Sequence, residues 1–171
     1  LHLSTSHTSN DPKSQVWSPL FLDGSDDPLQ RGIPRVHDLG VTFLGAPIGN
    51  PAFTRQALAN KVEKIRSITN LLPNLKKPHL EFVLLRSCIG LPKFMFTLRT
   101  AMTSSFPDLL SSFDSTIREA LIQILGTPLQ EQQWSQCKLP VSQGGLGIRS
   151  AEDHAGVAYS SSVSASKTLV K

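Results

Sequence analysis

The stretch VTFLGAPIG at residues 41–49 decides how the centre of this chain is organised. Its apolar start is typical of a short buried strand and consists of Val41, Phe43 and Leu44. Gly45, Pro47 and Gly49 favour the backbone conformations that a turn requires. Because a basic helical pattern begins at Thr54, we expect a strand and a turn that lead directly into a helix.

Two helical patterns follow this junction. In the first, apolar residues recur at three- and four-residue spacing before Pro73, at Leu58, Val62, Ile65, Ile68, Leu71 and Leu72. Pro78 suits the first turn of a second helix, which Gly90 ends. The expected inner face of this second helix consists of Leu80, Val83, Leu84 and Cys88. Pro92 then opens a short apolar segment with Phe94, Phe96 and Leu98.

A third helix has the clearest pattern in the chain. Ser105 and Asp108 have the spacing of a capping box at its start, and Gly126 is suited to its end. Its apolar face consists of Leu109, Leu110, Phe113, Ile117, Leu121, Ile124 and Leu125. This length and spacing predict a long helix that buries one side.

The remaining residues predict shorter elements. We expect a short helix around residues 130–136 and a glycine turn at residues 144–147. Ser150 and Asp153 form another capping-box pair, which begins an Ala- and Ser-rich helix that frays near Lys167. The predicted fold is therefore mainly α, with a small β-hairpin followed by a helical bundle.

Composition restricts the class of protein. A chain of 171 residues can bury roughly two-thirds of its unfolded surface. Cys88 and Cys137 lack the paired spacing of a metal site or a disulfide framework. No apolar run approaches the roughly 20 residues of a membrane span, and no signal-peptide pattern occurs at the start. We expect an intracellular protein of the nucleus or cytoplasm, without a membrane partner, and, since it begins with Leu1, a fragment of a longer reading frame.

Charge is distributed unevenly along the chain. The net charge is only +4, but residues 54–104 carry nine Lys or Arg and two Glu, a net +7. The rest carries eight basic and eleven acidic residues, a net −3. A polyanionic partner is one explanation for the basic segment. The other is an ordinary set of solvated helix faces, because no run of five like charges occurs.

Patterns for catalysis and metal binding are weak. Asp26 and Asp27 are adjacent carboxylates, and two-metal polymerases use such groups to hold magnesium ions. The pair lies in a turn sequence without the apolar flanking strands of a polymerase site, so we assign it to a surface turn. The five histidines are scattered, and none has metal-ligand spacing to a Cys or a carboxylate. We expect no metal or cofactor site in this chain.

Four segments, taken together, resemble the region downstream of the catalytic aspartates in non-LTR retroelement reverse transcriptases. They are NDPKSQVW at 10–17, FLGAPIG at 43–49, LLRSCIGLPKF at 84–94, and Trp134 with LPVSQGGLGIRSA at 139–151. The resemblance covers most of the chain from Asn10 to Ser162. The Tyr/Phe-x-Asp-Asp motif, its partner aspartate and the fingers of that family are missing from this sequence, so no complete active site can be assembled.

The resemblance implies a palm remnant over residues 1–50, an α-helical thumb over 51–128 and a connecting region over 129–171. It places Phe43, Leu44 and Gly45 in a primer-grip hairpin. It also implies that Lys13 approaches the incoming triphosphate and protonates the pyrophosphate as a general acid, with a solvated loop lysine as the alternative.

The expected function is that of a fragment of an RNA-directed DNA polymerase, which binds an RNA/DNA primer-template duplex through phosphates and does not polymerise alone. The expected nucleic-acid contacts are Lys61, Lys64, Arg66, Arg86 and Lys93. Magnesium is expected only in the complete polymerase, whose upstream fingers and palm would be protein partners. The alternative is a non-enzymatic helical protein-interaction module derived from a retroelement.

Overall fold

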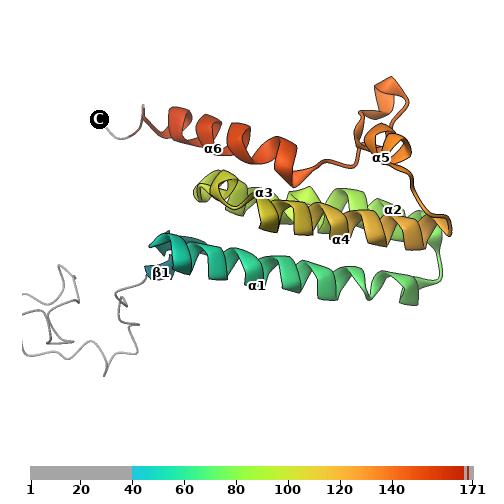
Figure 1. Cartoon of the computed structure of the whole chain (residues 1–171), viewed down its shortest axis with the longest axis horizontal. Coiled ribbons are helices and arrows are strands. Elements are labelled where there is room, and N and C mark those ends of the chain that lie inside the picture. Colours follow the sequence, from blue (N-terminus) through green and yellow to red (C-terminus); the bar gives the residue numbers. More distant parts are fainter. Residues whose placement is uncertain (1–39, 168, 170–171) are drawn as a thin grey trace, which may run out of the picture.

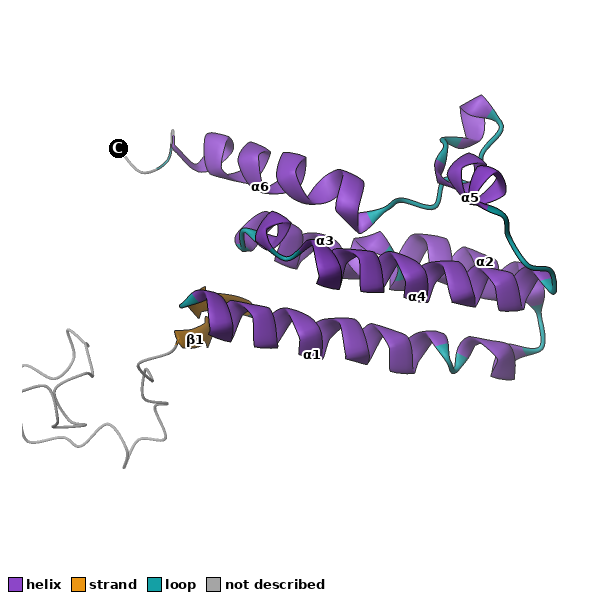
Figure 2. Cartoon of the chain, viewed as in Figure 1, coloured by secondary structure: helices purple, strands orange, loops and turns teal. Residues whose placement is uncertain are grey.

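A computed structural model describes residues 40–167 and residue 169 of the chain. These residues form one two-stranded hairpin and a stack of helices, which confirms the predicted mainly α fold with a small β-hairpin (Figures 1 and 2). Of the described helices, none is both long and apolar enough to cross a membrane. Lys13, Asp26 and Asp27 lie outside the described residues.

The hairpin consists of β1 (Gly40–Phe43) and β2 (Ala46–Gly49), paired antiparallel. Its turn is formed by Leu44 and Gly45, which have φ angles of 50° and 84°. Two positive φ angles in a two-residue turn match the twist of the flanking strands. The prediction of a buried strand with a wider turn is wrong, because Pro47 lies inside β2 and the side chains of Phe43 and Leu44 are 62% and 83% exposed. Within residues 40–167, β2 packs on α1 and α3, and the end of β1 is left exposed.

Helix α1 (Pro51–Thr69) follows the hairpin directly, as predicted. Asn50 caps it, because its side-chain Oδ1 accepts a hydrogen bond of 2.8 Å from the backbone N–H of Phe53. Pro51 occupies the first helical position, where a missing N–H is harmless. The predicted inner face of α1 is confirmed at Leu58, Val62 and Ile65, which are all buried. It is wrong at Leu71, which lies beyond the end of the helix and is 61% exposed.

Helix α2 (Pro78–Leu84) follows a short 3-10 turn (Leu72–Leu75), continues as a single π-helical turn (Leu85–Ile89) and leads into α3 (Leu91–Thr100). The inner face predicted for α2 is wrong, since its members Leu80, Val83 and Leu84 are 42%, 52% and 36% exposed. The residues that this segment buries instead are Glu81, Leu85 and Ile89. Apolar spacing misassigns this face because a polar residue, Glu81, takes a buried position, where its Oε1 accepts a hydrogen bond of 3.0 Å from Lys77 N.

Helix α4 (Pro107–Leu125) ends at Gly126 in the left-handed conformation, as predicted. The capping box predicted at its start is wrong. Phe106 is the N-cap residue and provides no side-chain hydrogen bond, whereas the carboxylate of Asp108 forms an ion pair with Arg55 of α1. The Asp108 carboxylate therefore binds a side chain of another helix, although the spacing predicts that it caps its own helix.

The helices are arranged in layers. Helices α3 and α4 lie in the middle, with α1 on one side and α6 (Ala151–Lys167) on the other (Figure 1). The rings of Phe94 and Phe113 stack at the centre, with centroids 4.6 Å apart and planes 11° apart. Helix α5 (Glu131–Lys138) contributes Trp134 to the same apolar cluster. The domain boundaries after residues 50 and 128 stay predictions.

Asp114 of α4 ties the start of α6 to the middle layer. Its carboxylate accepts hydrogen bonds from the Ser150 hydroxyl, from Ala151 N at 2.7 Å and from Glu152 N at 3.3 Å. The predicted Ser150 cap is also present, because Asp153 N donates to Ser150 Oγ at 3.2 Å. Helix α6 thus begins on a carboxylate supplied from another helix, which favours the positive end of its dipole.

Removing this carboxylate is expected to destabilise the fold. We expect Asp114→Ala to lower the free energy of unfolding by about 2 kcal/mol and Asp114→Asn by about 1 kcal/mol, since Asn keeps one acceptor. Burial raises the pKa of Asp114 by more than the bonds from Ser150, Ala151 and Glu152 lower it. The folded chain therefore binds this proton more tightly than the unfolded chain, and the contribution of Asp114 to stability falls as the pH rises above about 3.9.

Urea unfolding of the wild type and of Asp114→Asn, measured at pH values below and above about 3.9, tests this pH dependence of stability. The stability advantage of the wild type should be larger at the lower pH. A difference that does not change with pH, or that grows as the pH rises, would contradict the assigned role of burial.

Candidate nucleic-acid interface

Three lysines form one cationic group on the surface, which we call the lysine cluster: Lys61, Lys64 and Lys93. Lys61 and Lys64 are three residues apart on α1 and therefore neighbours on its surface, whereas Lys93 comes from the first turn of α3. Partial burial lowers the pKa of Lys61, and the positive charges of Lys64 and Lys93 lower it further. Bringing an anion to this cluster would relieve the repulsion among the three ammonium groups.

A small cavity of about 240 Å³ joins this cluster to the hairpin. Gly45 of the hairpin turn, Asn60 and Lys61 of α1, and Thr97 of α3 contribute to its lining. Thr97 is only 2% exposed, and its hydroxyl has no hydrogen-bond partner among the residues that the structure describes. The cavity therefore offers a buried hydroxyl and an amide beside a lysine, at the point where the predicted primer grip meets the predicted thumb.

Exposed apolar side chains lie beside the same cluster. The ammonium of Lys61 lies 5.9 Å from the centroid of the Phe96 ring, and Phe96 is 46% exposed. A Cβ built on Gly45 would lie 3.7 Å from that ring, so the hairpin turn packs next to Phe96. Aromatic faces next to cations are the combination that surfaces for nucleic-acid strands use, through base stacking and phosphate attraction.

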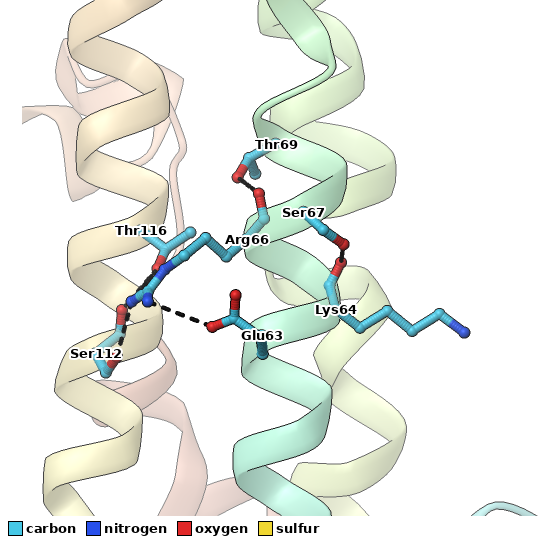
Figure 3. A network of polar contacts seen from close by, with 7 residues as sticks. All are labelled: Glu63, Lys64, Arg66, Ser67, Thr69, Ser112 and Thr116. Carbon is cyan, nitrogen blue, oxygen red and sulfur yellow. Dashed lines mark hydrogen bonds and ion pairs between the residues drawn. The ribbon is translucent and has the colours of Figure 1, made fainter.

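Arg66 is not part of this cluster. Its guanidinium extends toward α4, where it donates to Ser112 Oγ at 3.3 Å and to Thr116 Oγ1 at 3.5 Å (Figure 3). It also forms an ion pair of 3.4 Å with Glu63. Lys64 points the other way, out from α1 and away from α4 (Figure 3). The structure thus makes Arg66 a link between α1 and α4 and leaves Lys64 free to reach a ligand.

Arg86 also lies apart from the lysine cluster. It contributes to a separate cleft, in which its guanidinium lies against Gly147 of the segment between α5 and α6. Of the five predicted nucleic-acid contacts, the structure therefore brings three together and separates two. Sequence reasoning missed Asn60 and Thr97, for which the sequence has no signal, since tertiary packing alone places them in the cavity.

Metal and thiol chemistry have little support in this region. Across residues 40–167, no group of three His, Cys, Asp or Glu side chains is placed to hold a metal ion. Cys88 is exposed and Cys137 is buried, and the two thiols are not joined.

A scan against protein-family models and searches of curated proteins and of solved structures found no match to this chain.

Proposed function

We propose that this chain is a fragment of a retroelement reverse transcriptase and that its lysine cluster grips the phosphates of an RNA/DNA primer-template duplex. The observation that carries the proposal is the convergence of the lysine cluster, the hairpin turn and the cavity between them. Cations held on a rigid helix suit phosphate contacts, which position a duplex without reading its sequence. Exposed Phe43 and Leu44 would face the primer or the upstream palm of the parent polymerase.

The fragment is proposed to bind but not to polymerise. Magnesium would act only in the complete polymerase, where carboxylates supplied by the upstream palm would hold it. An extension assay on a primed RNA template with magnesium tests this part. No synthesis is expected from the fragment, and appreciable synthesis would show that Asp26 and Asp27 had been misassigned to a surface turn. In the cell such a polymerase would act in the nucleus or the cytoplasm.

Duplex binding is expected to depend strongly on salt. With three or four phosphates neutralised, log affinity should fall with log salt concentration at a slope of about −3. The double variant Lys61→Gln/Lys64→Gln should reduce the magnitude of this slope by about 2 and weaken binding roughly fifty-fold near 0.1 M salt. Fluorescence anisotropy of a labelled RNA/DNA duplex, measured over a series of salt concentrations, gives both quantities.

A matched variant distinguishes the effect of the lysine cluster on affinity from the effect of net charge. Lys76→Gln/Lys77→Gln removes the same charge from two exposed lysines beyond the end of α1, and it should change affinity much less. The Lys76/Lys77 variant should keep its stability to within about 0.5 kcal/mol, because both side chains are exposed. The Lys61/Lys64 variant should lose no more than about 1 kcal/mol, since Lys64 is exposed and Lys61 is only partly buried over Phe96. Equal losses of affinity in the two double variants, or binding that does not respond to salt, would rule out the lysine cluster as the grip.

A second candidate function rests on a different surface. Helix α2 and the turn before it leave five apolar side chains exposed: Leu71, Leu75, Leu80, Val83 and Leu84. A helical interaction module would use such a face to contact a partner protein. Lys61→Glu/Lys64→Glu distinguishes the two candidates, because charge reversal should abolish duplex binding and leave binding through the α2 face intact.

A further inference from the structure

A second basic site shares no lining residue with the lysine cluster, although its Pro92 directly precedes Lys93 in the chain. A cleft of about 530 Å³ is formed where the π turn and the start of α3 meet the segment between α5 and α6. All the ionisable side chains that line it are basic: Arg86, Lys138, Arg149 and His154. Apolar side chains, among them Leu85, Pro92 and Val141, form part of its walls. This volume is in the range of small-molecule sites, and the charge selects for anions.

The two arginines of the cleft carry uncompensated charge. Within residues 40–167, neither Arg86 nor Arg149 forms an ion pair. Lys138 is partly neutralised, since its ammonium lies 3.6 Å from the Asp153 carboxylate. The nearby Asp114 carboxylate is engaged by the start of α6. Two guanidinium groups on a concave surface therefore have no anionic partner in the described part of the chain.

Gly147 leaves room for the guanidinium of Arg86 beside the main chain. A Cβ on Gly147 would come within 3.2 Å of the Cζ, Nε and Nη2 atoms of Arg86, so the guanidinium lies against bare main chain. Gly147 also has a φ of 68°, which favours glycine. Arg86 is exposed, so the planar guanidinium can present its N–H groups to an oxyanion in the cleft.

His154 and the start of α3 also line the cleft. His154 Nδ1 lies 2.8 Å from the carbonyl oxygen of Ser150. A carbonyl only accepts, so Nδ1 carries the hydrogen, and Nε2 of the neutral ring is an acceptor. The arginines, not His154, therefore supply the donors for an anion. Helix α3, ten residues long, begins at this cleft with Gly90 as an N-cap that provides no side-chain hydrogen bond. The positive end of the α3 dipole therefore adds to the field of the two arginines.

We propose that this cleft binds the phosphate group of a nucleotide, with Arg86 and Arg149 as its charged ligands. Pro92 and Val141 would contact the less polar part of the nucleotide. The proposal does not depend on duplex binding by the lysine cluster, because the two sites use different residues. A free nucleoside monophosphate and the terminal phosphate of a nucleic-acid strand present the same chemistry to this cleft.

Nuclear magnetic resonance of the full chain with adenosine monophosphate and with inorganic phosphate tests the proposal. Amide shifts should concentrate at Ser87, Gly90 and Gly147 rather than at residues 57–64. Arg86→Gln/Arg149→Gln should weaken binding at least about tenfold, since each removes charge-assisted hydrogen bonds. Lys76→Gln/Lys77→Gln, with the same change in net charge, should leave the affinity within about twofold.

Three results would overturn the proposal. They are an absence of shifts up to roughly 10 mM nucleotide, shifts confined to the lysine cluster, and equal weakening in the two double variants. Should the arginine variant fail to fold, Ser87→Glu places a carboxylate at an exposed lining position, and unchanged binding in that variant would also overturn it.

Two further measurements support or extend a positive result. Lys61→Gln/Lys64→Gln should retain nucleotide binding even where it loses the duplex, which keeps the two proposals separable. Competition by a short oligodeoxythymidylate with a 5′-phosphate is compared with competition by its 5′-hydroxyl form. This comparison identifies whether the bound phosphate belongs to a strand end or to a free nucleotide. Competition by the phosphorylated form only assigns the cleft to a strand end, and competition by neither form assigns it to a free nucleotide.

Discussion

Phe113→Ala is expected to lower the free energy of unfolding by about 3–5 kcal/mol, because it removes one ring of the stacked pair at the centre of the bundle. Phe113 and its partner Phe94 are both 0% exposed, and they join α4 to α3 in the middle layer. The neighbouring side chains belong to packed helices on both sides, so the site cannot collapse fully and a cavity remains. Urea unfolding followed by circular dichroism measures the loss.

Phe96→Ala is the matched control for this change. Phe96 lies on the same helix as Phe94 but is 46% exposed, so its truncation should cost less than about 1 kcal/mol. Similar losses in the Phe113 and Phe96 variants would contradict the position assigned to the core. A loss at Phe113 of under 1 kcal/mol would indicate that the stacked pair contributes little to the stability of the bundle.

The inner faces of the long helices could be predicted along most of their length, because they follow one period, and the prediction fails only at their ends, where Leu71 and Leu125 are exposed. In α1 and α4 the predicted residues Leu58, Ile65, Phe113 and Ile117 are all buried. The inner face of α2 could not be predicted, because Glu81, a polar residue, is buried there and accepts a hydrogen bond from Lys77 N. The capping box predicted from the spacing of Ser105 and Asp108 is also wrong, because the Asp108 carboxylate forms an ion pair with Arg55 of α1.

Some residues of the candidate site could likewise be predicted from spacing, and others are brought together only by tertiary packing. Lys61 and Lys64 share a face by helical spacing alone, which the sequence shows directly. Lys93 joins them only through packing of α3 on the rest of the bundle, and Arg66 leaves them because Ser112 and Thr116 of α4 bind its guanidinium. Charge composition predicts that cations are present, but tertiary packing decides which of them meet.

Gly145→Ala is expected to have the second large effect, because there is no room for a side chain at this glycine. A Cβ would lie 2.1 Å from the backbone oxygen of Leu139 and 2.7 Å from that of Gln136, and the obstacle is main chain that cannot rotate away. The turn around Gly145 wraps the end of α5, where Leu146 N and Ile148 N both donate to Cys137 O at 3.2 Å. Displacing this turn releases those bonds.

We expect Gly145→Ala to destabilise the fold by about 3 kcal/mol or more, as overpacking adds to the lost hydrogen bonds. The fluorescence of Trp134, which lies on α5 and is 8% exposed, should report the release of this helix. A Trp17→Phe background makes Trp134 the single tryptophan, since the chain contains two. Urea unfolding in that background gives the magnitude.

Gly144→Ala separates lack of space from backbone strain. Gly144 has a φ of 78° but no atom within 4 Å of an added Cβ, so alanine there costs only the left-handed conformation, about 1 kcal/mol. Gly145 has the opposite problem, with a crowded Cβ position and no positive φ. A loss at Gly145 no larger than the loss at Gly144 would mean that the turn moves aside, and the wrapped end of α5 would then not be a fixed wall of the basic cleft.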